Sequence, residues 1–327
     1  MEIVLYIVLL LVGFAALIKG ADWFVDGSSG VARLLRVPGV IIGLTIVAMG
    51  TSAPELAVTI SAAAQGANEI ALSNVVGSNI FNTLVVLGVC AIIRKVPVDR
   101  AIIKRDFPFS IIVSIATLAV VGFGIIQNTA LLNVDMSENV GVIGRVFSII
   151  LLVVFIAYMV MLVILARKNK TEDDEAKNKM PVWKCIIFII IGLACIIIGG
   201  QLVVNNAKEI AAAAGMSETL IGLTVVALGT SLPELVTSAV ASKKGENGLA
   251  IGNVVGSNIF NLMLILGVSG AINPIAVNLA SVFDLAILIV VSILAYIFAR
   301  SKNDISRGEG IVLVLLYAAD MVFAIMR

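Results

Sequence analysis

Two glutamates, Glu55 and Glu234, occur in the middle of long uncharged apolar segments, and each ends the same short motif. Residues 50–55 read GTSAPE and residues 229–234 read GTSLPE. A carboxylate at membrane depth costs about 2.5 kcal/mol or more, so it indicates a functional site by default. The hydroxyls three and four positions before each glutamate lie on the same helix face as the carboxylate. The motifs therefore predict oxygen clusters that suit a cation.

Each motif also contains a proline, which interrupts a helix. Pro54 has no N–H to give the carbonyl of Gly50, and Pro233 has none for the carbonyl of Gly229. Irregular backbone at membrane depth is tolerated only where it lines a cavity or is buried in protein. We therefore expect broken helices at both motifs, with carbonyl oxygens directed inward.

A second repeated segment follows each of these motifs. Residues 73–82 read SNVVGSNIFN and residues 252–261 read GNVVGSNIFN. Ser78 and Asn82 are four positions apart and so share a helix face, as do Ser257 and Asn261. The second segment thus adds hydroxyl and amide oxygens to each cluster.

Every ligand that these segments offer is a hard oxygen donor. Calcium takes about six to eight such oxygens, whereas zinc, copper and iron favour His or Cys ligands. The chain contains no histidine, and Cys90, Cys185 and Cys195 lack metal or disulfide spacing. Calcium, or sodium with similar preferences, is the expected ion.

The composition places these motifs in a membrane. The chain is 60% hydrophobic and 13% charged, whereas soluble proteins average about half apolar and about a quarter charged. Its apolar stretches are long and do not alternate, which indicates spanning helices rather than barrel strands. We predict an all-α integral membrane protein with ten spans: 2–19, 38–64, 69–93, 107–126, 144–166, 183–207, 217–242, 247–272, 280–299 and 309–326.

The repeat and the span count together predict two inverted halves. Residues 43–89 align without a gap with residues 222–268, and 27 of these 47 positions are identical. Five spans per half mean that the second copy enters the membrane in the opposite sense, an arrangement that places the substrate site near the midplane. We expect a first half at 1–166, a short cytoplasmic linker at 167–182 and a second half at 183–327.

The positive charges predict the orientation. With both termini extracellular, the cytoplasmic connections hold 19 of the 22 Lys and Arg residues, and only Arg145, Lys208 and Arg327 lie on the other side. Basic loops remain in the cytoplasm, so this skew supports an even number of spans in the cell membrane.

Paired GTSxPE and GNxxGSN-type segments, one pair per half, resemble the two alpha repeats of the calcium/cation antiporter superfamily, and most closely its prokaryotic sodium/calcium exchangers. The resemblance implies broken second, third, seventh and eighth helices, exchange of calcium for several sodium ions at an alternately exposed site, and neither a cofactor nor an obligate protein or nucleic-acid partner. By motif position it implies these ion ligands: Ala48, Thr51, Ser52, Glu55, Ser78, Asn82, Ala227, Thr230, Ser231, Glu234, Ser257 and Asn261.

One position differs among relatives. Microbial and potassium-dependent exchangers carry an aspartate in the second repeat where this chain has Asn261, which matches Asn82 in the first. Our hypothesis is a site with two formal negative charges that needs no potassium.

Other functions remain open. The motifs could serve only as small-residue helix contacts, although packing does not require a glutamate. A proton/calcium exchanger would use the same fold, but that branch resembles GNxxE in place of GTSxPE. An intramembrane enzyme would need HExxH or paired intramembrane aspartates, and the candidate spans contain neither. A passive channel is disfavoured because broken helices with paired acids suit tight binding.

Overall fold

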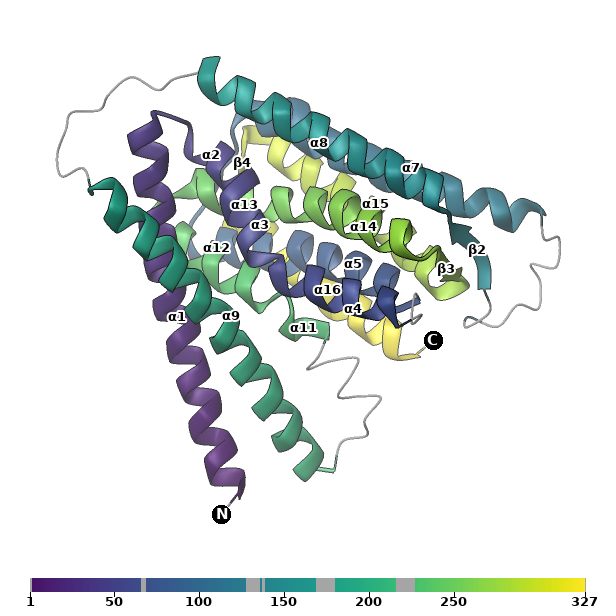
Figure 1. The fold of residues 1–327 in the computed structure, drawn as a ribbon, viewed down its shortest axis with the longest axis horizontal. Helices are drawn as coiled ribbons and strands as arrows, with labels where there is room; N and C mark the ends of the chain where they lie inside the picture. The colour runs from purple at the N-terminus through teal and green to yellow at the C-terminus, as the bar shows by residue number, and fades with distance from the viewer. Residues whose placement is uncertain are drawn as a thin grey trace.

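In the computed structural model, the described residues form a predominantly helical assembly with four short strands (Figure 1). It describes residues 2–65, 69–127, 136, 139–168, 180–215 and 227–326. The first half contains α1 (Glu2–Leu35), α2 (Gly39–Ile42), the π-helical turn η1 (Gly43–Val47), α3 (Ala48–Thr51), α4 (Ala53–Ala64), α5 (Glu69–Phe81), η2 (Asn82–Val86), α6 (Leu87–Ile93), η3 (Ile102–Asp106), α7 (Phe107–Gln127) and α8 (Arg145–Lys168). The second contains α9 (Val182–Ala213), α11 (Ala227–Gly229), α12 (Leu232–Lys244), α13 (Asn247–Phe260), η5 (Asn261–Ile265), α14 (Leu266–Ile272), α15 (Leu279–Lys302) and α16 (Arg307–Met326).

Two antiparallel strand pairs connect the halves. They are β1 (Val96–Pro97) with β4 (Asp304–Ile305), and β2 (Asn139–Ile143) with β3 (Ile275–Asn278). Because each pair takes one strand from each half, the halves form one bundle.

The helices of a membrane protein are present. Among the described residues, seven helices are long and apolar enough to cross a membrane, or eight if one bent pair counts as a span. That pair is Gly39–Thr51 with Ala53–Ala64, bent by 49°. Residues 216–226, which cover the start of the predicted span 217–242, lie outside the described residues.

The second helix is broken where the sequence predicts it, whereas the third and eighth are not. α3 ends at Thr51 and α4 begins at Ala53, with Pro54 in its first turn. In contrast, Ala71–Ile93 and Asn247–Ile272 each run as one continuous helix with a π-helical turn. Neither range contains a proline, so the backbone widens instead of breaking.

The first helix is longer than predicted. We expected a span at 2–19 followed by a connection, but α1 continues to Leu35, just before Pro38. The extension packs against α9, and Figure 1 shows the two helices side by side. A Cβ atom on Gly20 would lie 2.8 Å from the carbonyl oxygen of Gly192, and one on Gly192 would lie 2.7 Å from that of Gly20. Glycine therefore permits this close contact.

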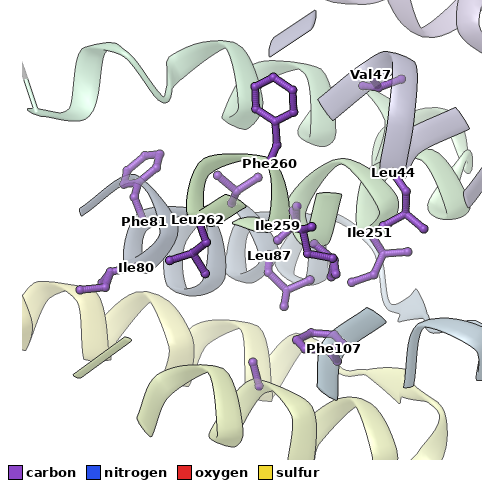
Figure 2. Packing of buried hydrophobic residues seen from close by; sticks show 14 of the residues in the cluster. Leu44, Val47, Ile80, Phe81, Leu87, Phe107, Ile251, Ile259, Phe260 and Leu262 are labelled. Atoms are coloured by element: carbon purple, nitrogen blue, oxygen red, sulfur yellow. The ribbon is translucent and has the colours of Figure 1, made fainter. Parts of the chain in front are cut away.

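The core lies around α13. The segment Asn247–Ile272 is almost entirely buried, whereas less than a third of the most apolar stretch of α1, of α8 and of α9 is buried. α13 packs against η1 and α2 of the first half. Figure 2 shows Leu44 of η1 beside Ile251 of α13, with Phe260 and Leu262 farther along the second-half helix. The central helices of the two halves therefore hold the duplicated motifs against each other.

Candidate functional site

The two GTSxPE motifs meet, and each serine binds the glutamate of the other motif. Ser52 Oγ donates to Glu234 Oε1 at 2.7 Å, and Ser231 Oγ donates to Glu55 Oε1 at 3.2 Å. All four side chains have no exposed surface. The two glutamates therefore belong to one site rather than to two.

The helix breaks explain this crossed pairing. Ser52 and Ser231 precede α4 and α12 with non-helical dihedrals, and neither makes a capping hydrogen bond to its own helix. Both hydroxyls are consequently available to the opposite motif. Glu55 and Glu234 lie in the first turns of these helices, where the positive end of the helix dipole favours a carboxylate.

The serines of the second segment extend each pairing. Ser257 Oγ lies 3.5 Å from Glu234 Oε1, and Ser78 Oγ lies 3.1 Å from Ser231 Oγ. The result is two matching groups, each with one glutamate and the hydroxyls of two serines.

Several oxygen atoms of the site remain without a hydrogen-bond partner among the described residues. Glu55 and Glu234 each leave Oε2 unpaired, and the amides of Asn82 and Asn261 leave their oxygens unpaired. The hydroxyl of Thr230 is also unpaired. Buried polar atoms are normally satisfied, so such a group of free oxygens within one buried site suits a bound cation.

The remaining predicted residues lie at the same breaks with different contacts. Thr51 Oγ1 donates to the side-chain oxygen Oδ1 of Asn253 at 3.0 Å, and Asn253 is not among the predicted ligands. The carbonyl of Ala48 accepts from the amide of Ser52 at 3.0 Å. Ala227 is the first residue of α11. The structure thus places Thr51 and Ala48 beside the site but already hydrogen bonded.

A surrounding layer of amides was missed from the sequence. Asn74 Nδ2 donates to Thr59 Oγ1 at 3.0 Å, and Asn253 Nδ2 donates to Ser238 Oγ at 2.9 Å. These pairs occupy equivalent positions in the two halves. Both asparagines lie inside the repeated SNVVGSNIFN and GNVVGSNIFN segments, so their identity in both copies is a signal that could have found them.

The donor set determines the chemistry. No group of three or more His, Cys, Asp or Glu side chains that could hold a metal occurs within the described ranges. The site instead combines two carboxylates with hydroxyl and amide oxygens. Two buried carboxylates repel each other at close range unless cations or protons neutralise them. The arrangement suits reversible binding of calcium or sodium better than a softer metal.

Comparison with known proteins gives a family match over nearly the whole chain. The family model described as "Sodium/calcium exchanger protein" matches residues 5–164 and 184–326. Two curated relatives are the putative antiporter CaxA of Alkalimonas amylolytica, 36% identical with 95% of both chains covered, and the sodium/calcium exchanger MaX1 of Methanosarcina acetivorans, 33% identical with 96% of this chain and 97% of the relative covered.

Solved structures agree with this match. One structure of the sodium-calcium exchanger NCX_Mj, soaked with 10 mM Na⁺ and no Ca²⁺, has a TM-score of 0.82 and 32% sequence identity. The alignment covers 98% of this chain and 99% of that chain. Other structures of the same exchanger, soaked with Ca²⁺ or Sr²⁺, have TM-scores of 0.81.

Proposed function

Because the chain belongs to the sodium/calcium exchanger protein family, a family of membrane antiporters, we propose that it exchanges calcium for sodium by alternating access. The observation that carries the proposal is the crossed pairing of Ser52 with Glu234 and of Ser231 with Glu55. It brings both carboxylates into one buried site and leaves an oxygen of each unpaired. Calcium and sodium are the transported substrates.

We assign twelve residues as ion ligands. The glutamates supply charge, the hydroxyls and amides supply neutral oxygens, and the two alanines supply carbonyl oxygens. They are Ala48, Thr51, Ser52, Glu55, Ser78, Asn82, Ala227, Thr230, Ser231, Glu234, Ser257 and Asn261. The unpaired oxygens of Glu55, Glu234, Asn82 and Asn261 support this assignment, as does the Thr230 hydroxyl.

The proposed architecture has ten spans in two inverted halves, 1–166 and 183–327, joined by a cytoplasmic linker at 167–182. Both termini lie outside the cell. The crossed Ser–Glu pairs support the inversion, because equivalent residues of the two halves make equivalent contacts across the site.

The charge of the site supports coupling to sodium without potassium. Glu55 and Glu234 are the two acids of the ligand set, and Asn261 adds no charge. One calcium ion or two sodium ions neutralise two carboxylates, whereas a third sodium ion leaves a net positive site. We expect the empty site, with two unneutralised buried charges, to resist crossing the membrane, which favours exchange over leak.

Calcium uptake into liposomes tests the function directly. Purified protein is reconstituted, and uptake is measured under an imposed sodium gradient, under an imposed pH gradient and with or without potassium. We expect uptake with the sodium gradient and equal rates with and without potassium. Uptake driven by the pH gradient alone would support the proton/calcium exchanger instead, and strict dependence on potassium would contradict the charge argument.

The crossed serines give a prediction of their own. Ser52→Ala and Ser231→Ala each remove a hydroxyl that contacts a carboxylate, an interaction of about 1.5–3 kcal/mol. Each is therefore expected to lower the apparent calcium affinity about tenfold or more. Ser61→Ala, in the exposed part of the same helix as Glu55, serves as the control. Titration of sodium-driven uptake against external calcium measures all three, and unchanged affinity in both site variants would contradict the pairing.

We further propose that α1 and α9 slide past the site during alternating access. Their glycine contact provides a smooth surface, and an ionic cluster holds α1 to the end of α12. Lys244 Nζ lies 2.6 Å from Oδ1 of both Asp22 and Asp26, and Arg33 Nη2 lies 3.2 Å from Glu246 Oε1. These contacts stabilise the arrangement in which α1 lies against α12.

Removing the lysine is expected to shift the balance between the two access states. Partly exposed ion pairs contribute about 0.5–1 kcal/mol each, and Lys244 makes two of them, so Lys244→Gln is expected to shift this equilibrium by about fivefold to about 30-fold. The measurement compares apparent calcium affinity at the two faces, in right-side-out and inside-out vesicles. We expect opposite changes at the two faces for Lys244→Gln and no change for the neighbouring Lys243→Gln. Equal changes at both faces would show that the cluster has no role in access.

A further inference from the structure

Two buried asparagines, Asn79 and Asn258, lie next to the ligand serines but belong to no ligand set. They follow Ser78 and Ser257 in the repeated segment, and they are 0% and 6% exposed. Their amides form a chain that runs between the halves and ends at Asn261. This chain determines which atom of Asn261 faces the site.

The orientation of Asn79 follows from a backbone carbonyl. Asn79 Nδ2 donates to the carbonyl oxygen of Asn258 at 3.1 Å, and a carbonyl can only accept. The other end of the amide, Asn79 Oδ1, is therefore the atom that meets Asn261. It accepts from Asn261 Nδ2 at 3.0 Å. Asn261 then presents its remaining atom, Oδ1, which has no partner among the described residues.

The orientation of Asn258 follows in the same way. Thr83 Oγ1 donates to the carbonyl oxygen of Asn79 at 2.8 Å, so the hydroxyl oxygen is left to accept. Asn258 Nδ2 donates to it at 2.9 Å. Both amides are thus set by backbone acceptors rather than by each other.

Thr83 makes the two halves unequal. The residue at the equivalent position of the second half is Leu262, which has no hydroxyl. Asn79 therefore reaches the carbonyl of Asn258 directly, whereas Asn258 reaches the carbonyl of Asn79 only through Thr83. The contact from Asn258 Oδ1 to Asn82 Nδ2 that symmetry would require is not made, and neither atom has a partner among the described residues.

We propose that Asn79 is a positioning residue that holds the amide of Asn261 with its oxygen toward the ions, while the insertion of Thr83 leaves the amide of Asn82 free to turn. The inference rests on the proposed function, because it takes Asn261 as an ion ligand. Asn261 is then a preset oxygen donor. Asn82 offers either its oxygen to a cation or its NH₂ to a water or carboxylate. Of the two asparagine ligands, Asn261 is therefore fixed in orientation and Asn82 is adaptable.

A double-mutant cycle tests the role of Asn79. Asn79→Ala is made in the native chain and in the Asn261→Asp variant, in which both carboxylate oxygens are equivalent and need no orientation. In the native chain, we expect Asn79→Ala to lower calcium affinity about tenfold, as for the loss of one neutral contact. In the Asn261→Asp variant, we expect the same change to lower calcium affinity less than about threefold. Binding is read in detergent from calcium-dependent thermal stabilisation, and transport from liposome uptake. Equal effects in both backgrounds would mean that Asn79 is merely structural.

A second variant keeps the inference testable if Asn79→Ala does not fold. Leu262→Thr leaves both asparagines intact and introduces a hydroxyl that can intercept Asn79 Nδ2, as Thr83 intercepts Asn258 in the other half. In the native chain, Leu262→Thr is expected to lower calcium affinity as Asn79→Ala does. In the Asn261→Asp variant, it is expected to have little effect on calcium affinity. Unchanged calcium affinity of Leu262→Thr in the native chain would overturn the inference. Absence of sodium-driven uptake by the native chain would instead contradict the proposed function, so the two failures are distinguishable.

Discussion

Glu55→Gln and Glu234→Gln are each expected to abolish sodium-driven calcium uptake. Either change removes one of two buried charges and leaves the other to face a divalent cation alone. Loss of a charge-assisted contact of about 3 kcal/mol lowers affinity about 100-fold. Uptake of calcium by liposomes under an outward sodium gradient measures the effect. Because the carboxylates lie in one site, the two variants are expected to fail to the same extent.

The control is Glu209→Gln, which neutralises an exposed glutamate of α9 outside the site. It is expected to transport like the native chain. Size-exclusion profiles of all three variants in detergent show whether the fold is retained. We expect native profiles, because glutamine has nearly the same volume as glutamate and leaves no cavity. Normal exchange by either site variant would mean that the ion site lies elsewhere.

Gly252→Val is expected to destroy the contact that aligns the halves. A Cβ atom on Gly252 would lie 2.6 Å from the carbonyl oxygen of Val40 and 2.9 Å from the Cα atom of Gly43. Both neighbours are backbone atoms and cannot move aside as a side chain does. Overpacking typically costs about 1–3 kcal/mol and more where the backbone must shift. α13 would move away from η1, and Asn253 of α13, which accepts a hydrogen bond from Thr51, would move with it.

The measurement combines thermal stability in detergent with sodium-driven uptake, and both are expected to fall sharply. Gly39→Ala is the matched control on the same interface, because its new Cβ atom would lie 3.8 Å from the Leu249 side chain, an ordinary contact. Native stability of Gly252→Val would show that α13 and η1 do not need this close approach.

The repeated motifs predict much of the site because their chemistry is local. A glutamate, two hydroxyls and a proline within six residues indicate a broken helix with oxygen ligands in any membrane protein. The break after Thr51 confirms the predicted interruption of the second helix. The breaks that the family resemblance implies for the third and eighth helices are absent, and a π-helical turn at Asn82 and at Asn261 stands where each break was expected. A widened turn leaves no signal comparable to a proline.

The length of α1 was missed for a related reason. Hydropathy falls after Lys19, which predicts the end of the span there, but the helix continues through polar residues such as Asp22 and Asp26, which pair with Lys244. Lys244 is more than 200 positions away from both aspartates in the chain. Local composition therefore predicts where the apolar part ends, but not where the helix ends.

Composition, an internal repeat with 27 of 47 positions identical and the oxygen-bearing motifs are properties of the chain, so they predict the class of protein, the family and the residue types of the candidate site. The pairing follows only from how the helices pack: Ser52 binds Glu234 and not Glu55, and Asn79 binds Asn261 and not Asn82. These contacts join residues of different halves. Helical spacing relates neighbours within one helix, whereas the packing of α13 against the first half determines which atoms meet across the site.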